Sequence, residues 1–319
     1  MSKLNQGELE HLFSRKHAHE HVYDMLLENL ETMEMIERGC NLLETWVAIP
    51  AEYQTKQERK DTLASMNIQK IVEETLTRII SIRGETPLAS LAGQIGVAYN
   101  FADTRQGITL AAEIIAVLYN TGFFEIYQPY FRSPYYVKPN FALDEESQEI
   151  VDKAMYLPPM VCKPNKLKHN RSSGYLTIKG ESLILGKGIN HHDEEIGLDV
   201  LNLMNSIPLS ISTEFREYCL EEPTFDLTTV EGAENMSRVQ LMHAVNQQRL
   251  NWEDHLRKST ALYDLMIEEG NKFYLTHKVD KRGRIYSQGY HINPQGTSFK
   301  KAVVELANKE TIDVPSSFF

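Results

Sequence analysis

Residues 271–301, NKFYLTHKVDKRGRIYSQGYHINPQGTSFKK, carry most of the information about this chain. The stretch contains seven lysine and arginine residues but a single carboxylate, that of Asp280. The whole chain has a formal net charge of -11, so its positive charge is concentrated here and not spread evenly. A basic segment in an acidic protein predicts a surface that binds a polyanion. The alternative is a surface β-hairpin whose charges only face solvent.

The segment DKRGRIY at 280–286 places two arginines around a glycine. Because Gly283 has no Cβ, its backbone can take a positive φ or approach a ligand closely. The planar guanidinium groups of Arg282 and Arg284 match the geometry of phosphate oxygens. Asp280 cannot itself hold phosphate, so we expect it either to brace one arginine or to close the turn through a hydrogen bond to the backbone.

This stretch resembles the single-subunit RNA polymerases of phages and mitochondria. The resemblance rests on GNKF at 270–273, DKRGRIY at 280–286, NPQG at 293–296 and Lys301. In that family the Asp-x-x-Gly-Arg motif lies beside the active site and grips the template strand and the nascent RNA–DNA hybrid. Two departures are present: Lys281 stands where the phage enzymes have tryptophan, and one extra residue separates Tyr286 from Asn293.

The resemblance implies a fold and a set of contact residues. The fold would be mainly α with small β-hairpins, comprising the N-terminal domain and the start of the polymerase core of a single-subunit RNA polymerase. Residues 1–156 would form a helical N-terminal domain with a β-hairpin near 123–141, and residues 157–319 a basic loop, long helices and the Asp-x-x-Gly-Arg hairpin. The residues implied to contact template or hybrid are Asp280, Arg282, Gly283, Arg284, Tyr286, Asn293, Gln295 and Lys301.

Composition agrees with a globular protein. At 319 residues and 42% hydrophobic content, the chain is long enough to bury a sizeable core. No apolar run approaches the roughly 20 residues that span a bilayer, and the polar start lacks the apolar region of a signal peptide. We therefore expect a cytoplasmic protein with no membrane partner, and the resemblance to phage enzymes narrows this to the cytoplasm of an infected host cell.

The cysteines are too widely separated to indicate a disulfide framework or a cysteine zinc site.

Periodic apolar residues predict most of the helices. The predicted helices cover residues 7–45 (one long helix or a helical pair), 68–82, 108–119, 144–154 and 232–269. The proline-rich passage at 157–164 disfavours helix and marks the domain boundary. After Gly296, Thr297 or Ser298 is expected to cap a last helix that runs through Ala307.

After Gly122 the apolar spacing changes from that of a helix to that of strands, which predicts the β-hairpin near 123–141. The polymerase family places a strand-separating hairpin after a comparable helix. The resemblance therefore implies that residues near this turn stack on the upstream edge of opened DNA. These residues are Tyr130, Phe131, Arg132, Tyr135 and Tyr136. The alternative is a buried hairpin whose tyrosines belong to the hydrophobic core.

A second basic patch follows the proline-rich passage. It consists of Lys163, Lys166, Lys168 and Arg171. The patch precedes a Gly-Tyr pair at 174–175, and the family has a similar proline-rich passage leading to Gly-Tyr. The patch is a secondary candidate site, and we expect any single lysine in it to be an ordinary solvated loop residue.

The common catalytic motifs are missing from the chain. It has no G-x-x-x-x-G-K-[ST] phosphate loop, no G-x-S-x-G elbow and no H-E-x-x-H motif. The consecutive residues from His191 to Glu195 would point in different directions, so we predict no catalytic residue, metal site or cofactor in this chain. Nucleotidyl transfer by two metal ions requires aspartates that clamp both metals. In the polymerase family those aspartates come well after the Asn-Pro-Gln-Gly passage, beyond Phe319.

The resemblance therefore implies the N-terminal subunit of a split, heterodimeric phage DNA-directed RNA polymerase, a nucleotidyltransferase. A catalytic C-terminal subunit would carry the aspartates and Mg²⁺. This chain, inactive alone, would bind template DNA and nascent RNA during transcription of phage genes, and Phe318 and Phe319 would lie near its partner. The alternative is a noncatalytic nucleic-acid-binding transcription regulator that shares only the Arg282 and Arg284 hairpin with polymerases.

Overall fold

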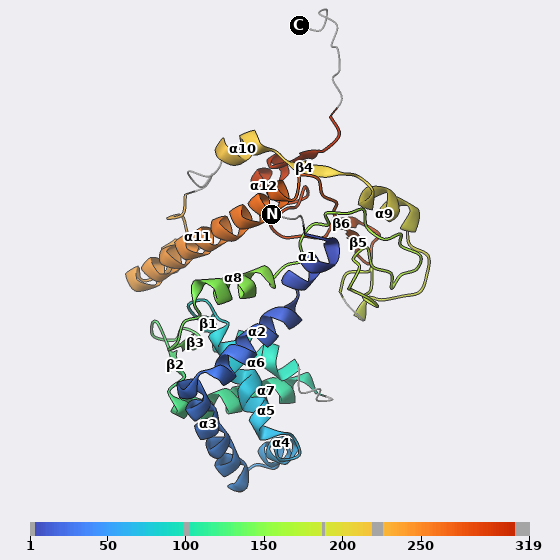
Figure 1. Ribbon diagram of the computed structural model, residues 1–319. Coiled ribbons are helices and arrows are strands. Elements are labelled where there is room, and N and C mark those ends of the chain that lie inside the picture. Colours follow the sequence, from blue (N-terminus) through green and yellow to red (C-terminus); the bar gives the residue numbers. More distant parts are fainter. Residues whose placement is uncertain (1–3, 98–102, 187–188, 219–225, 310–319) are drawn as a thin grey trace, which may run out of the picture. The chain divides into compact units, whose positions relative to one another are not determined.

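The computed structural model describes residues 4–97, 103–186, 189–218 and 226–309, so Phe318 and Phe319 lie outside the described residues. The described chain is mainly helical with a few small antiparallel sheets, as expected (Figure 1). It divides into two compact units. We call Arg15–Asp152 with Arg238–His243 the helical unit, and Met1–Ser14, Lys153–Ser237 and Ala244–Phe319 the arginine-hairpin unit. No helix within the described ranges combines the length and apolar character needed to cross a bilayer.

The helical unit is built from consecutive helices and one small sheet. Its elements are α2 (Arg15–Glu28), α3 (Leu30–Ala48), α4 (Gln54–Ala64), α5 (Ile68–Ile80), α6 (Leu88–Gly96), α7 (Thr104–Leu118), the 3-10 helix η2 (Tyr119–Thr121), α8 (Glu145–Lys153), and the strands β1 (Thr86–Pro87), β2 (Phe124–Tyr127) and β3 (Tyr136–Pro139). The strand order is β1-β3-β2, and both pairs are antiparallel. The β-hairpin predicted near 123–141 is therefore present as β2 and β3.

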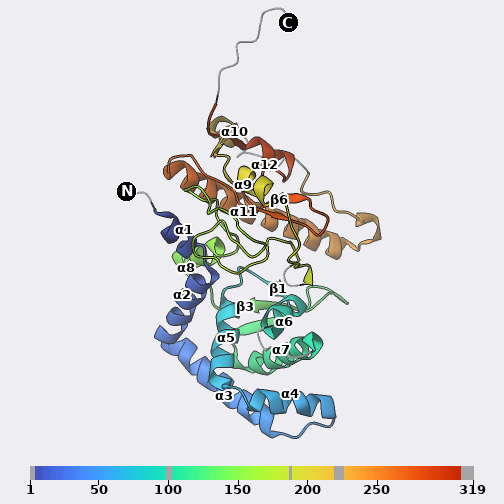
Figure 2. The same cartoon turned by 90° about the vertical axis from the view of Figure 1, so that its right-hand side faces the viewer.

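The helices of this unit lie side by side (Figures 1 and 2), and their apolar side chains form a buried core. Core side chains come from α3, α5 and α7, among them Leu43, Leu76 and Leu110, which are fully buried. Helices α6 and α7 cross at close range, because a Cβ added to Gly96 would lie 2.6 Å from backbone atoms of Gly107. Only residues without side chains allow two backbones to approach this closely.

The prediction of one long helix or a helical pair over residues 7–45 was wrong. Three helices cover this region: α1 (Gln6–Leu12), α2 and α3. The break before α3 has a clear cause, since the Asn29 side chain accepts hydrogen bonds from the backbone amides of Glu31 and Thr32 and so caps a new helix.

The arginine-hairpin unit contains short elements around one long helix. They are α1, α9 (Leu198–Asn205), α10 (Thr213–Tyr218), the 3-10 helix η4 (Ala233–Asn235), α11 (Arg238–Glu268), α12 (Ser298–Ala302), and the strands β4 (Leu209–Ile211), β5 (His277–Val279), β6 (Ile285–Ser287) and β7 (Val304–Leu306). The first six residues of α11 belong to the helical unit. Buried side chains of α1, α11 and the segment after α11 form the core, including Leu9, Tyr263 and Phe273.

The last predicted helix begins as expected but ends early. The Thr297 side chain accepts a hydrogen bond from the amide of Lys300 and caps α12, which stops at Ala302. The next residues form β7, which pairs antiparallel with β4. Continuation of the helix through Ala307 was therefore wrong, because pairing with a strand almost a hundred residues earlier takes precedence over local helix propensity.

Candidate nucleic-acid interface

The arginine hairpin consists of β5, β6 and the turn between them, and its strands are antiparallel. Two hydrogen bonds close the turn. The amide of Asp280 donates to the carbonyl of Arg284 at 2.9 Å, and the amide of Gly283 donates to the carbonyl of Asp280 at 2.9 Å. Gly283 has a φ of +78°, in the left-handed region that favours glycine. Three-residue hairpin loops commonly end in such a residue, so the turn itself requires this glycine.

Asp280 fulfils both expected roles and braces two arginines, not one. Its Oδ1 accepts hydrogen bonds from the backbone amides of Arg282 at 2.9 Å and Arg284 at 3.0 Å. Its Oδ2 lies 3.1 Å from Nη2 of Arg282 and 2.7 Å from Nη2 of Arg284, and accepts from the Nε of each. One carboxylate therefore fixes both the turn and the two guanidinium groups.

The electrostatics of this group favour an anionic ligand. Burial of the Asp280 carboxyl opposes its ionisation, but hydrogen bonds from Arg284 outweigh that effect and lower its pKa. The same hydrogen bond raises the pKa of Arg284. The side chains of Arg282 and Arg284 remain 62% and 53% exposed, whereas that of Asp280 is 14% exposed. The three groups together keep one net positive charge, with guanidinium N–H groups accessible to phosphate oxygens.

Tyr286 contacts both Asp280 and Arg284. Its hydroxyl donates to Oδ2 of Asp280 at 3.4 Å, and the guanidinium carbon of Arg284 lies 5.6 Å from its ring centroid. The ring is half-buried. A cation placed over an aromatic face is held more firmly than a solvated one, so Tyr286 further restricts the orientation of Arg284.

Asn293 and Gln295 hold the hairpin through their side-chain amides. The Gln295 Oε1 accepts from the amide of Ser287 at 2.7 Å, and its Nε2 donates to the carbonyl of Ile285 at 3.0 Å. Gln295 thus supplies β6 with the two hydrogen bonds that a neighbouring strand would make. Asn293 donates from Nδ2 to the carbonyl of Gly289 at 3.0 Å and accepts from the amide of Gln295 at 2.9 Å. Both amides have internal partners, so a direct contact with nucleic acid stays a prediction.

Lys301 lies exposed on α12, and its neighbour Lys300 has a different environment. The Nζ of Lys300 donates to the carbonyl of Tyr290 at 2.6 Å and lies 3.8 Å from the centroid of the Tyr290 ring. Burial lowers the pKa of Lys300. Lys300 therefore anchors the loop before α12, while the ammonium group of Lys301 faces solvent.

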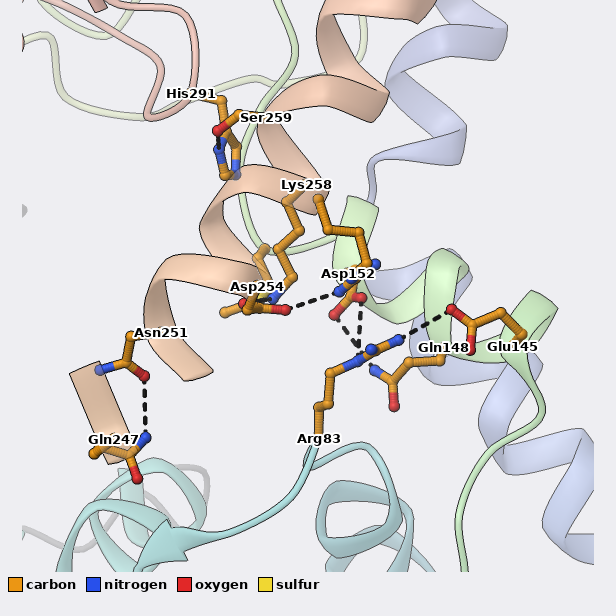
Figure 3. A network of polar contacts seen from close by, with 12 residues as sticks. Arg83, Glu145, Gln148, Asp152, Gln247, Asn251, Asp254, Lys258, Ser259 and His291 are labelled. Carbon is orange, nitrogen blue, oxygen red and sulfur yellow. Dashed lines mark hydrogen bonds and ion pairs between the residues drawn. The ribbon is translucent and has the colours of Figure 1, made fainter. Parts of the chain in front are cut away.

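Two buried histidines, one in β5 and one in the loop after β6, are hydrogen-bonded to helices, and sequence reasoning did not find them. The Nδ1 of His277 lies 2.9 Å from Oδ1 of Asn205 in α9, and burial lowers the pKa of His277 to about 4. The Nδ1 of His291 lies 2.8 Å from Oγ of Ser259 in α11 (Figure 3). Burial, followed by the nearby charge of His255, lowers the pKa of His291 to about 3. Both histidines are therefore neutral at physiological pH and act as hydrogen-bonding core residues.

The second basic patch is a loop with all four side chains exposed: Lys163, Lys166, Lys168 and Arg171. It belongs to the same unit as the arginine hairpin. The following segment adds to the hairpin directly. The amide of Val279 donates to the carbonyl of Leu183 at 2.9 Å, and the amide of Leu185 donates to the carbonyl of Val279 at 2.7 Å. Residues 183–185 therefore run parallel to β5 as an additional extended segment.

The aromatic hairpin of the helical unit has an exposed tip and a packed base. Phe131 is 83% and Tyr135 54% exposed, and Arg132 lies over the Phe131 ring with a φ of +63°. Tyr130 and Tyr136 instead make edge contacts with His243 in α11, at ring-centroid distances of 5.8 and 6.1 Å. Tyr130 and Tyr136 are half-buried and are not core residues, and strand separation stays a prediction.

Within the residues that the structure describes, no group of three or more histidine, cysteine, aspartate or glutamate side chains could hold a metal ion.

Comparisons with known proteins add one relationship. No family model matches the chain. It is 24% identical over 187 residues to a probable DNA-directed RNA polymerase of Gelasinospora sp. (strain G114). This match covers 55% of the chain and 20% of the relative, so the chain spans only about a fifth of that protein's length.

Proposed function

We propose that this chain acts in transcription, as the template- and hybrid-binding part of a DNA-directed RNA polymerase. The observation that carries the proposal is the arginine hairpin, in which one carboxylate holds Arg282 and Arg284 side by side with their guanidinium groups exposed. Two pre-oriented guanidinium groups suit successive phosphates of a nucleic-acid backbone. Distant similarity to a probable DNA-directed RNA polymerase supports the same class of activity.

In this proposal, the side chains of the hairpin have separate roles. Arg282 and Arg284 bind phosphates, Asp280 positions them, and Gly283 permits the turn. Tyr286 restricts the motion of Arg284. Lys301 provides a further phosphate contact from α12. Phe131 and Tyr135, exposed at the tip of the aromatic hairpin, stack on unpaired bases of opened DNA.

We further propose that catalysis belongs to a second polypeptide, with which this chain forms a heterodimer. That partner carries the aspartates that hold Mg²⁺ and performs nucleotidyl transfer, while this chain binds template DNA and nascent RNA. The setting is the transcription of phage genes in the cytoplasm of an infected cell. These roles follow the resemblance to single-subunit RNA polymerases in the motif at 280–286 and the NPQG passage.

Binding to matched nucleic-acid scaffolds tests the proposal. The full chain is expected to bind an RNA–DNA hybrid with a single-stranded template overhang more tightly than duplex DNA of the same length. Replacing Arg282 and Arg284 by glutamine is expected to remove this preference. A preference for duplex DNA that survives the double replacement would contradict the proposal and would favour the transcription regulator.

A further inference from the structure

The loop at 163–180, KPNKLKHNRSSGYLTIKG, has an unusual charge. It contains five lysines and arginines, Lys163, Lys166, Lys168, Arg171 and Lys179, and no carboxylate. All five side chains are exposed, and Nη1 of Arg171 donates to the carbonyl of Gly180 within the same loop at 3.5 Å. An acidic protein that keeps 18 consecutive residues free of negative charge leaves a local positive potential on its surface.

The backbone of this basic loop is held at several points even though it has no regular secondary structure. The amide of Leu167 donates to Oδ1 of Asn202 at 2.7 Å, and Nδ2 of Asn202 donates back to the carbonyl of Leu167 at 3.0 Å. The hydroxyl of the buried Tyr175 donates to the carbonyl of Pro158 at 2.8 Å. An irregular loop fixed by buried side chains presents its outer residues in a defined arrangement, which is typical of binding loops.

Glu10 of α1 makes the most specific of these contacts. Its carboxylate is buried, at 3% exposure, and accepts hydrogen bonds from the amides of Leu176 at 2.9 Å and Thr177 at 2.7 Å. It also accepts from the hydroxyl of Thr177 and from Nε2 of Gln6. Burial alone would raise the pKa of this carboxyl, but the hydrogen bonds outweigh that effect and lower it. A buried carboxylate is costly unless hydrogen-bonded, and this one binds loop backbone without neutralising any loop cation.

The basic loop and the arginine hairpin share one packed body. One buried apolar cluster contains Leu167 from the loop, Leu183 from the segment that follows the loop, and Val279 from β5. Beyond the loop, Glu181 forms an ion pair with Lys278 of β5, with 3.0 Å between Oε2 and Nζ. A ligand that contacts both elements would therefore meet a surface whose two halves keep a fixed separation.

We infer that the basic loop is a second phosphate-binding surface, which engages the same nucleic acid as the arginine hairpin, and that Glu10 is the positioning residue that keeps the loop in shape. This inference rests on the proposed function. Because the loop adds contacts beyond the hairpin, it matters only for a ligand long enough to reach both. Short strands, of about 6 nucleotides, bind to one element, and strands of about 30 nucleotides reach both.

The test compares affinities of the full chain for single-stranded DNA and for RNA–DNA hybrid, each in the short and the long form, as salt is varied. The variant carries Lys166→Gln and Lys168→Gln, and the control carries Lys16→Gln and Lys70→Gln, which remove the same charge from the helical unit. Each phosphate contact contributes about 0.7 to 0.9 to the magnitude of the slope of log K against log salt. This contribution corresponds to about five- to eightfold in affinity at about 0.1 M salt relative to about 1 M salt. The loop variant is expected to lose more than about tenfold on long ligands and almost nothing on short ones.

Glu10→Gln gives an independent readout. It is expected to increase hydrogen exchange at residues 174–180 and to lower long-ligand affinity, while Glu10→Asp restores part of both. Unchanged long-ligand affinity and salt slope in the Lys166 and Lys168 variant would overturn the inference. If Arg282→Gln and Arg284→Gln still weaken short-ligand binding in that case, the proposed function stands and only the role of the loop is refuted.

Discussion

The role of Gln295 can be separated from that of the arginines by one substitution. Gln295→Ala removes the acceptor for the amide of Ser287 and the donor for the carbonyl of Ile285. Ser287 is buried, and an unsatisfied buried amide costs about 1 to 3 kcal/mol. The carbonyl of Ile285 can bind water instead, because its hydrogen bond is exposed. We therefore expect the hairpin to open more easily by about 1 to 3 kcal/mol.

Hydrogen exchange suits this prediction better than global unfolding, since a chain with two units does not unfold in a single transition. Each 1.4 kcal/mol is a factor of ten, so protection of amides in residues 277–287 is expected to fall by about five- to 150-fold. Gln288→Ala is the matched control, because its side chain makes only a 3.5 Å contact with the carbonyl of Tyr286. Weaker nucleic-acid binding by Gln295→Ala with unchanged hydrogen exchange would refute the bracing role and indicate a direct contact.

Three further predictions concern other parts of the chain. Asp280→Asn keeps an acceptor for the amides of Arg282 and Arg284 but loses the charge, so NMR should show an intact hairpin with mobile guanidinium groups; rigid groups would contradict the bracing. His277 has its pKa lowered to about 4, below the usual 6.5, so the unfolded state takes up its proton first; the contribution of His277 to stability should be constant above about pH 6.5 and fall by about 3 kcal/mol by pH 4. His291, with its pKa lowered to about 3, should add a comparable fall, so His277→Gln is expected to reduce the acid-induced loss by about 3 kcal/mol without abolishing it, and an unchanged loss would contradict the lowered pKa of His277. Gly96→Ala should destabilise the helical unit by about 1 to 3 kcal/mol, because the added methyl group clashes with the backbone of Gly107. Gly93→Ala is the control and should stabilise the unit by about 0.5 to 1 kcal/mol, because its methyl group meets no atom within 4 Å. Equal melting temperatures for the two variants would exclude the close crossing of α6 and α7.

Features set by local sequence could be predicted, and the arginine hairpin is the best case. The turn at 280–286 depends on residues at most six positions apart, so Asp280, Gly283 and the two arginines could be assigned from their spacing. The cap at Thr297 is local for the same reason. The Asn29 cap was equally local, and it was missed because the apolar spacing continues on both sides of it.

Features set by contacts between distant segments could not be predicted. The partners of His291 and His277 lie 32 and 72 positions away, so no spacing identifies either histidine as a buried hydrogen-bonding residue. Glu10 contacts Leu176 across 166 positions and looked like an ordinary surface glutamate. The strand β7 was predicted as helix because its pairing partner β4 lies almost a hundred positions earlier.

The central claim is that Arg282 and Arg284 bind nucleic-acid phosphates, and the salt dependence of hybrid binding tests it most directly. The affinity of the full chain for a short RNA–DNA hybrid is measured between low and moderate salt for the native chain, for Arg282→Gln with Arg284→Gln, and for Lys16→Gln with Lys70→Gln. Loss of two phosphate contacts is expected to reduce the slope of log K against log salt by about 1.4 to 1.8 in the arginine variant alone. Equal slopes for all three proteins would contradict the claim.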